Sequence, residues 1–362
     1  MSKAASTSAR APARVVVRFC AAPAAGGAPV ELPVAVRELE YADGGLGFRL
    51  FPAALWLAAW LAARPAWISG ATVLELGAGL GLVGLAAAKQ GAAVTLSDFN
   101  PGLLTALEAA AKDNGVAATV AACDWADEAA AAAAERAAPA AGKAAGSAEA
   151  IDTAAFDRDA NPEYFRVRAQ LAASSGGIAE RLPAGASYDV AVASEVLYEA
   201  HAAAALPALL SRRLAPGGRF VTLMAVRDVA LVETFLSRCQ AFGMAVALRR
   251  IADVALPPGD AAEAAQAAAE ADSAKQAGRD APMCGGEWCS RGDAEWRALL
   301  ASGGAGGGPL EAAWLEARQP MDAPPPRQQQ GPCCSRRARG MACPCAARAA
   351  APPRAPPAAQ PG

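Results

Sequence analysis

Short apolar runs alternate with amphipathic segments along two stretches of this chain, from about residue 30 to 125 and from about 187 to 251. In the first stretch, β-rich apolar runs predict strands at 72–76, 92–97 and 117–123. Between them, apolar residues at helical spacing predict helices at 82–90 and 101–114. This alternation of strand and helix is typical of one half of a parallel, doubly wound α/β sheet.

The same alternation returns in the second stretch and extends the expected sheet. The predicted strands there are 188–194, 219–225 and 244–251, and the predicted helices are 202–214 and 229–242. Upstream, residues 32–39 alternate as a strand. A helix over 52–61 begins at Pro52, a residue that suits a first helical turn. We therefore expect an α/β fold with a doubly wound, mostly parallel sheet.

Alanine-rich, weakly patterned segments interrupt this fold. The expected parts are one domain over residues 31–318, low-complexity insertions within it at about 127–186 and 257–282, and a disordered Pro/Arg/Cys-containing tail at 319–362. Residues 1–30 form an N-terminal extension whose Ser, Ala and basic residues resemble an organellar transit segment. The run Val15 to Phe19 also has a strand pattern, which leaves open that it belongs to the fold.

A glycine-rich turn joins the strand at 72–76 to the following helix. Gly79, Gly81 and Gly84 match the dinucleotide fingerprint G-x-G-x-x-G. Glycine permits positive φ angles and lets the backbone approach a ligand closely. Asp98 ends the next strand, where a carboxylate can accept hydrogen bonds from ribose hydroxyls. These features predict a site for an adenosine-containing ligand but leave open NAD and S-adenosylmethionine.

Residues around the turn favour S-adenosylmethionine. Glu75 precedes the glycines, where a carboxylate is poorly placed for a pyrophosphate but suits a ligand with an amino group and a sulfonium. Asp124 and Trp125 follow the third strand, where a carboxylate can accept from the adenine amino group and an indole can cover the ring. The chain lacks the Tyr-x-x-x-Lys pattern of a dehydrogenase, and His201 is its single histidine. An NAD-dependent oxidoreductase remains the less favoured alternative.

Several segments then carry a family likeness; they are VLELGAGLGLVGLAA, VTLSDFNP, DW, SEVLY and LAPGGRF. Together they resemble the seven-strand class I S-adenosylmethionine-dependent methyltransferases, and more narrowly the methyltransferase-like protein-lysine methyltransferases (methyltransferase family 16). The likeness covers about residues 40–125 and 187–251. It implies a seven-stranded Rossmann-like sheet, S-adenosylmethionine as cofactor, and methyl transfer to a lysine side chain of a protein.

The resemblance also implies roles for individual residues. At the cofactor it places Gly77, Ala78, Gly79, Gly81, Asp98, Trp125 and Ser194, in addition to Glu75 and Asp124. Phe51 occupies an upstream position that is often Trp in the family. Glu195 and Tyr198 form the family's acidic-x-x-Tyr motif, which faces the acceptor and is expected to be catalytic.

Composition narrows the partners. With 33 basic and 35 acidic residues, the chain has no basic field for nucleic acid. Its best apolar run, 51–63, is shorter than the roughly 20 residues of a membrane span. Cys333, Cys334, Cys343 and Cys345 lack the usual Cys-x-x-Cys spacing, so no metal site is expected. We expect a cytoplasmic monomer that acts on a protein, or an organellar one if residues 1–30 are a transit segment.

The acceptor stays open at this point. A methyltransferase for a small molecule or for another side chain, such as histidine, fits the same motifs, because acceptor specificity resides in loops. A cofactor-binding scaffold without turnover is a further alternative. Trp56 and Trp60, one helical turn apart, are expected in the core. His201 is expected at the surface of a helix start, and the pair Arg212 and Arg213 on a solvated face.

Overall fold

The computed structural model describes residues 13–21, 28–137, 158, 161–173, 181–250 and 312–321. The predicted insertion at 257–282, almost all of the predicted tail and its cysteines lie outside these residues. No single helix of the described part is long and apolar enough to cross a membrane, although the bent pair Tyr41–Gly47 and Pro52–Ala62 passes by length and composition.

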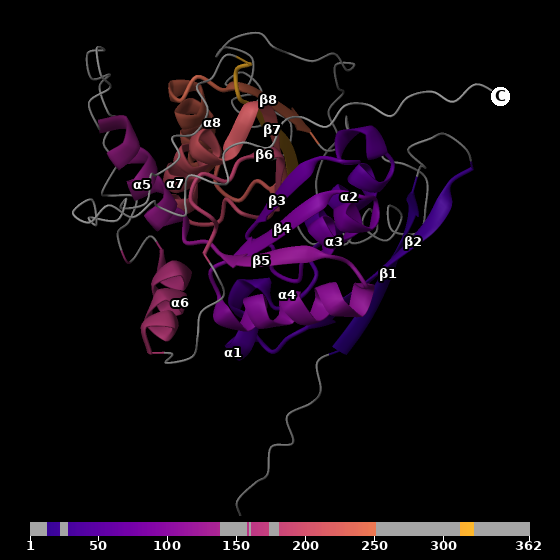
Figure 1. Ribbon diagram of the computed structural model, residues 1–362. Helices are drawn as coiled ribbons and strands as arrows, with labels where there is room; N and C mark the ends of the chain where they lie inside the picture. Colours follow the sequence, from indigo (N-terminus) through magenta and orange to yellow (C-terminus); the bar gives the residue numbers. More distant parts are fainter. Residues whose placement is uncertain are drawn as a thin grey trace, which may run out of the picture. The chain divides into compact units, whose positions relative to one another are not determined.

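A seven-stranded sheet with the strand order β5-β4-β3-β6-β7-β9-β8 forms the core of the described fold (Figure 1). Its strands are β3 (Thr72–Leu76), β4 (Ala93–Asp98), β5 (Ala118–Ala122), β6 (Tyr188–Ser194), β7 (Leu214–Ala225), β8 (Ala245–Arg250) and β9 (Ala312–Arg318). From β5 to β7 all neighbours run parallel, and β9 lies antiparallel between β7 and β8. The predicted doubly wound, mostly parallel sheet is confirmed.

The strand order reverses direction between β3 and β6. The chain proceeds from β3 through β4 to β5 on one side, and from β6 to β7 on the other. In open α/β sheets, this reversal leaves a crevice beyond the carboxyl ends of the two central strands, and ligands bind there. The turn after β3 and the loop after β6 therefore face the same crevice.

Helices cover both faces of the sheet (Figure 1). One core contains α2 (Pro52–Ala62), α3 (Leu82–Lys89) and α4 (Pro101–Asn114); the other contains α5 (Trp125–Ala137), α7 (Ala200–Arg213) and α8 (Val229–Ala241). The remaining helical segments are α1 (Tyr41–Gly44), η1 (Gly45–Gly47), η2 (Pro65–Trp67) and α6 (Pro162–Ala173). Because both faces are buried, the central strands are predominantly apolar rather than alternating between apolar and polar residues, with Glu75 of β3 as a buried exception. Trp56 and Trp60 lie in the first core, as predicted.

A two-stranded hairpin precedes this sheet. Strand β1 (Ala13–Ala21) pairs antiparallel with β2 (Val30–Glu38), and Phe19 is buried in the first core. The Asn114 side chain of α4 accepts from the Ala35 N–H at 2.9 Å and donates to the Ala35 carbonyl at 2.6 Å. The strand pattern from Val15 to Phe19 is thus confirmed, and part of the expected N-terminal extension packs on the fold.

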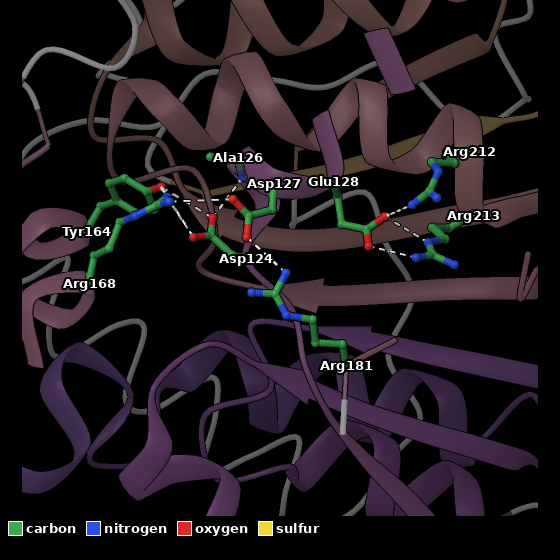
Figure 2. Close-up of polar contacts among 9 residues, drawn as sticks. All are labelled: Asp124, Ala126, Asp127, Glu128, Tyr164, Arg168, Arg181, Arg212 and Arg213. Atoms are coloured by element: carbon green, nitrogen blue, oxygen red, sulfur yellow. Dashed lines mark hydrogen bonds and ion pairs between the residues drawn. The ribbon is translucent and has the colours of Figure 1, made fainter. Parts of the chain in front are cut away.

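The start of the segment expected as an insertion is a regular helix, α5, which packs on α7 in the second core. From α5, Glu128 pairs with Arg212 at 2.5 Å and with Arg213 at 2.7 Å (Figure 2). The side chains of Arg212 and Arg213 are 8% and 2% exposed, so the prediction of a solvated basic face was wrong. Burial alone would raise the pKa of Glu128, but these two arginines hold it below its ordinary value.

Replacing Glu128 with alanine leaves the buried Arg213 without its carboxylate partner. Removing one partner of a buried ion pair costs about 3–5 kcal/mol, because the remaining charge stays desolvated. We expect the free energy of unfolding, measured by urea titration, to fall by that amount. Arg18→Ala serves as control because it removes an exposed pair with Glu31 and should cost at most about 1 kcal/mol. Equal effects of both substitutions would contradict a stabilising buried pair.

Candidate functional site

A cavity of about 760 Å³ lies at the carboxyl ends of the central strands. This volume falls within the range of roughly 300–1,000 Å³ that is usual for small-molecule and cofactor sites. Its walls come from the turn after β3, the loops after β4, β5 and β6, the segment that contains α1, η1 and the start of α2, and helix α6. The crevice expected from the strand order is therefore a real cavity.

The turn after β3 forms one wall, and Gly77, Ala78, Gly79 and Gly81 all line the cavity. Gly77 has φ +58°, and a Cβ there would lie 3.1 Å from the Trp125 ring and 3.2 Å from the Val196 side chain. A side chain at this position would displace the indole or Val196. The glycine therefore lets the turn pack against Trp125 while both residues line the same cavity.

The carboxylate of Glu75 lies beneath this turn rather than in the cavity. It is 2% exposed and accepts a hydrogen bond from the Gly84 N–H at 2.8 Å, in the first turn of α3. Burial raises the pKa of Glu75 to about 8; the N–H groups of Gly84 and Val83 oppose this shift, and the nearby charge of Asp98 adds to it. Glu75 does not line the cavity, and its expected direct contact with the cofactor stays a prediction.

Asp98 ends β4 and lines the cavity. One carboxylate oxygen accepts from the Gly79 N–H at 3.1 Å, and the other accepts from the N–H groups of Phe99 and Asn100 at 2.8 and 3.0 Å. Burial raises its pKa, which these hydrogen bonds partly oppose. A carboxylate oxygen has room for more than one donor, so Asp98 can still accept from ribose hydroxyls.

Trp125 and Asp124 are neighbours in sequence, but their side chains have different surroundings in the structure. Trp125 lines the cavity, whereas Asp124 does not. Asp124 accepts from the Ala126 N–H at 2.9 Å, at the start of α5, and from the Tyr164 hydroxyl of α6 at 3.3 Å (Figure 2). It also forms an ion pair with Arg168 at 2.9 Å. The carboxylate of Asp124 is turned toward α6 rather than into the cavity, and its predicted contact with adenine stays a prediction.

The end of β6 and the loop after it bring Ser194, Glu195 and Tyr198 to the cavity, and Phe51, just before α2, also lines it. Glu195 is the one non-glycine residue of the described part with positive φ, at +55°. Such a conformation costs on the order of 1–3 kcal/mol and persists where surrounding contacts impose it. Here its carboxylate accepts from the Ala225 N–H at 3.0 Å and from Arg227 at 2.8 Å.

Tyr198 stays protonated in this setting. Burial raises the pKa of its hydroxyl, and the charges of Glu199, Asp98 and Glu163 raise it further. A phenolate would meet negative charge on several sides. The Tyr198 hydroxyl can therefore act as a hydrogen-bond donor or acceptor at neutral pH but not as a base.

The sequence analysis did not predict a polar cluster that lies behind Trp125. His201 is 2% exposed, so its predicted surface position was wrong. Its ring stacks on Trp125 at a centroid distance of 5.9 Å, and its Nδ1 lies 3.0 Å from Oδ1 of Asn161. Glu199 accepts from the N–H groups of Glu163 and Tyr164 at 2.7 and 3.2 Å and so caps α6. The sequence did offer one sign of this cluster, because Glu199 directly follows the acidic-x-x-Tyr motif.

Helix α6 meets the segment α1–η1 at the rim of the cavity. Glu163 accepts from the Leu46 N–H at 3.2 Å and the Tyr41 hydroxyl at 3.3 Å, and it pairs with Arg166 at 2.6 Å. The Arg166 guanidinium also lies over the Tyr41 ring, 5.3 Å from its centroid. We call the contacts among Tyr41, Leu46, Glu163 and Arg166 the clasp. All of its residues line the cavity, so the clasp closes the rim on this side.

Three features of the structure agree with the match of this chain to a protein-family model. They are the strand order, the glycine turn and the carboxylate at the end of β4. This chain is a class I S-adenosylmethionine-dependent methyltransferase, with S-adenosylmethionine as its cofactor. More narrowly, residues 34–137 match the family model described as "Lysine methyltransferase". A comparison with curated proteins gave no match.

Solved structures that resemble the chain include the [4+2]-cyclase SpnF, at 17% identity and a TM-score of 0.39, over 78% of this chain and 86% of that one. A Haloferax volcanii methyltransferase in complex with its Trm112 activator has 15% identity and a TM-score of 0.37, over 78% and 95%. The Thermus thermophilus 16S rRNA N2 G1207 methyltransferase has 18% identity and a TM-score of 0.34, over 61% and 45%. Likenesses at this level carry no argument about activity.

Gly45 tests the clasp. It has φ +54°, and a Cβ there would lie 2.5 Å from both the Glu163 carboxylate and the Arg166 guanidinium. We expect Gly45→Ala to displace these side chains and to weaken the binding of S-adenosylhomocysteine, measured by calorimetry, roughly tenfold, the equivalent of about 1.4 kcal/mol. Gly70→Ala is the matched control, because Gly70 also has positive φ but a Cβ there meets nothing within 4 Å. Equal affinities of the two variants would show that the clasp does not hold the ligand.

Glu75 makes the stability of the fold depend on pH. Because the native pKa of about 8 exceeds the ordinary glutamate value of 4.5, the native chain keeps this proton where the unfolded chain has lost it. The contribution of Glu75 to stability therefore declines as the pH rises through this window. Glu75→Gln keeps an acceptor for Gly84 but does not titrate. In thermal unfolding, we expect the Tm of this variant to match that of the wild type at about pH 5 and to exceed it at about pH 9. A Tm difference independent of pH would contradict this assignment.

Proposed function

We propose that this methyltransferase modifies the side-chain amine of a lysine in another protein. The observation that carries the proposal is that Glu195 and Tyr198, the acidic-x-x-Tyr motif, line the same cavity as the glycine turn and Asp98. A cation-attracting carboxylate and an aromatic hydroxyl thus share one cavity with the proposed cofactor-binding residues. The description of the matched family model, lysine methyltransferase, supports the same acceptor.

The cofactor side of the proposed site is built from the two central strands and their neighbours. Gly77, Ala78 and Gly79 would lie along the methionine and ribose parts, Asp98 would accept from the ribose hydroxyls, and Trp125 would cover adenine. Glu75 acts from beneath by holding the turn. When bound, S-adenosylmethionine would supply a methyl group on a sulfonium for transfer to the acceptor nitrogen, with S-adenosylhomocysteine as the leaving group.

The acceptor side has to receive a cation and align it as an amine. A free lysine has a pKa near about 10.4 and arrives as an ammonium. Glu195 would attract and orient this group, and its proton can pass to water before methyl transfer. Tyr198, which stays protonated, would offer its hydroxyl or its ring face to the nitrogen. The protein contributes chiefly alignment and exclusion of water, since the leaving group is already activated.

We further propose that the enzyme works as a cytoplasmic monomer with a protein as its partner. Size-exclusion chromatography with light scattering tests the oligomeric state, and imaging of the tagged chain tests the compartment.

Glu195 tests the acceptor assignment. We expect Glu195→Gln to lower methyl transfer roughly 100-fold, because a positioned charge is lost, while the affinity for S-adenosylhomocysteine stays within about twofold. The assay follows tritiated methyl groups from the cofactor into proteins of a cell lysate. Glu108→Gln is the control, because this exposed carboxylate lies on α4 outside the cavity. Full activity of Glu195→Gln would overturn its assigned role.

Amino-acid analysis of the labelled proteins then identifies the acceptor. N-methyllysine supports the proposal. Label in methylhistidine or in the acid-soluble small-molecule fraction would replace it with one of the alternative acceptors. Absence of label with intact cofactor binding would favour a scaffold without turnover.

A further inference from the structure

The carboxylate that is proposed to bind the acceptor already forms an ion pair with an arginine. Arg227 lies in the loop between β7 and α8, and its Nη1 is 2.8 Å from Oε2 of Glu195. Both residues line the cavity. The other oxygen of Glu195 accepts from the Ala225 N–H. Each oxygen of this carboxylate therefore already has a donor before any acceptor arrives.

The two partners differ in how firmly they are held. The Glu195 side chain is 15% exposed and rests on strand β7 through Ala225, whereas the Arg227 side chain is 54% exposed. Leaving the pair returns the guanidinium to water at little cost, because pairs with such exposure are worth about 0–1 kcal/mol. The carboxylate, held by backbone at a strained φ, stays in place. Arg227 is thus the exchangeable partner.

The other cations that line the cavity are engaged elsewhere. Arg166 pairs with Glu163 in the clasp. Arg49 lies over the rings of Phe48 and Phe51, at 5.4 and 5.5 Å from their centroids. Of the described arginines at this cavity, Arg227 alone pairs with the acidic residue of the acidic-x-x-Tyr motif.

We propose that Arg227 is a specificity-determining residue whose guanidinium holds the cation seat at Glu195 until the acceptor's ammonium displaces it. The inference deepens the proposed function and rests on it for the identity of the acceptor. An incoming ammonium exchanges with the guanidinium rather than filling an empty site, so the net gain from charge alone is small. Acceptors are then selected by the additional contacts that they make around the cavity.

The test uses the full-length chain saturated with S-adenosylhomocysteine and n-butylammonium as a probe for the lysine side chain. Binding is followed by ligand-observed NMR titration, and n-butanol serves as the uncharged comparison. We expect Arg227→Gln to bind n-butylammonium about fivefold more tightly than the wild type, in line with the worth of an exposed pair. Arg227→Lys, which keeps a cation at the seat, should stay near the wild-type affinity.

Two further variants define the interpretation. The double variant Glu195→Gln with Arg227→Gln should lose the gain, because the carboxylate is gone. Arg18→Gln removes an arginine from an exposed ion pair on β1, remote from the lining residues, and should leave the affinity unchanged. Unchanged or weaker binding by Arg227→Gln, equal gains for n-butanol, or no binding to any of these proteins would overturn the inference.

This experiment separates the inference from the proposed function. N-methyllysine in the labelled lysate, together with an unchanged affinity of Arg227→Gln, would overturn the role of Arg227 and leave the lysine acceptor standing. Tighter n-butylammonium binding without N-methyllysine would support the exchangeable cation seat and overturn the lysine acceptor.

Discussion

The turn from β3 into α3 depends on two acidic side chains that accept hydrogen bonds from its backbone. Glu75 lies beneath the turn and accepts from the Gly84 N–H, while Asp98, on the neighbouring strand, accepts from the Gly79 N–H. Backbone N–H groups at a helix start favour such acceptors, since they have no partner within the helix. Because the turn is held at both ends, Gly77 packs closely against Trp125, where a Cβ would approach the indole to 3.1 Å. The position of this wall of the cavity follows from these hydrogen bonds.

The opposite wall is assembled from segments that are distant in sequence. Glu199, directly after the acidic-x-x-Tyr motif, caps α6 by accepting from its first N–H groups. Asn161 precedes α6 and accepts from the His201 N–H at 2.8 Å, and the His201 ring stacks on Trp125. The loop after β6, helix α6 and the indole are therefore positioned by one set of contacts. A change in α6 would be felt at Trp125 and at the loop that carries Tyr198, which links the proposed cofactor and acceptor sides.

Helices and strands with a clear periodicity of apolar residues could be predicted from the sequence. The cavity residues that stand at the ends of these strands could be predicted as well. The turn glycines, Asp98 and the motif from Glu195 to Tyr198 stand at strand ends, where parallel topology brings them together. The direction of Glu75 was also available in principle, because Leu74 and Leu76 lie in the second core and alternation turns Glu75 to the α3 side. Asp124 and His201 could not be placed, because their partners come from α6. That helix lies in an alanine-rich region whose spacing predicts no neighbour.

Two of the four acidic residues that line the cavity are paired with arginine before any acceptor binds. Glu163 is paired with Arg166, and Glu195 with Arg227. An entering ammonium therefore gains less from electrostatic attraction than it would next to an unpaired carboxylate. The cost of removing water from an unpaired buried carboxylate would, however, also be uncompensated. Selectivity has to come from contacts beyond the reacting group. Tyr41 and Leu46 are 46% and 39% exposed at the rim, and both also line the cavity. Such aromatic and apolar surface, held in place by the clasp, is suited to the residues that flank an acceptor on its own protein.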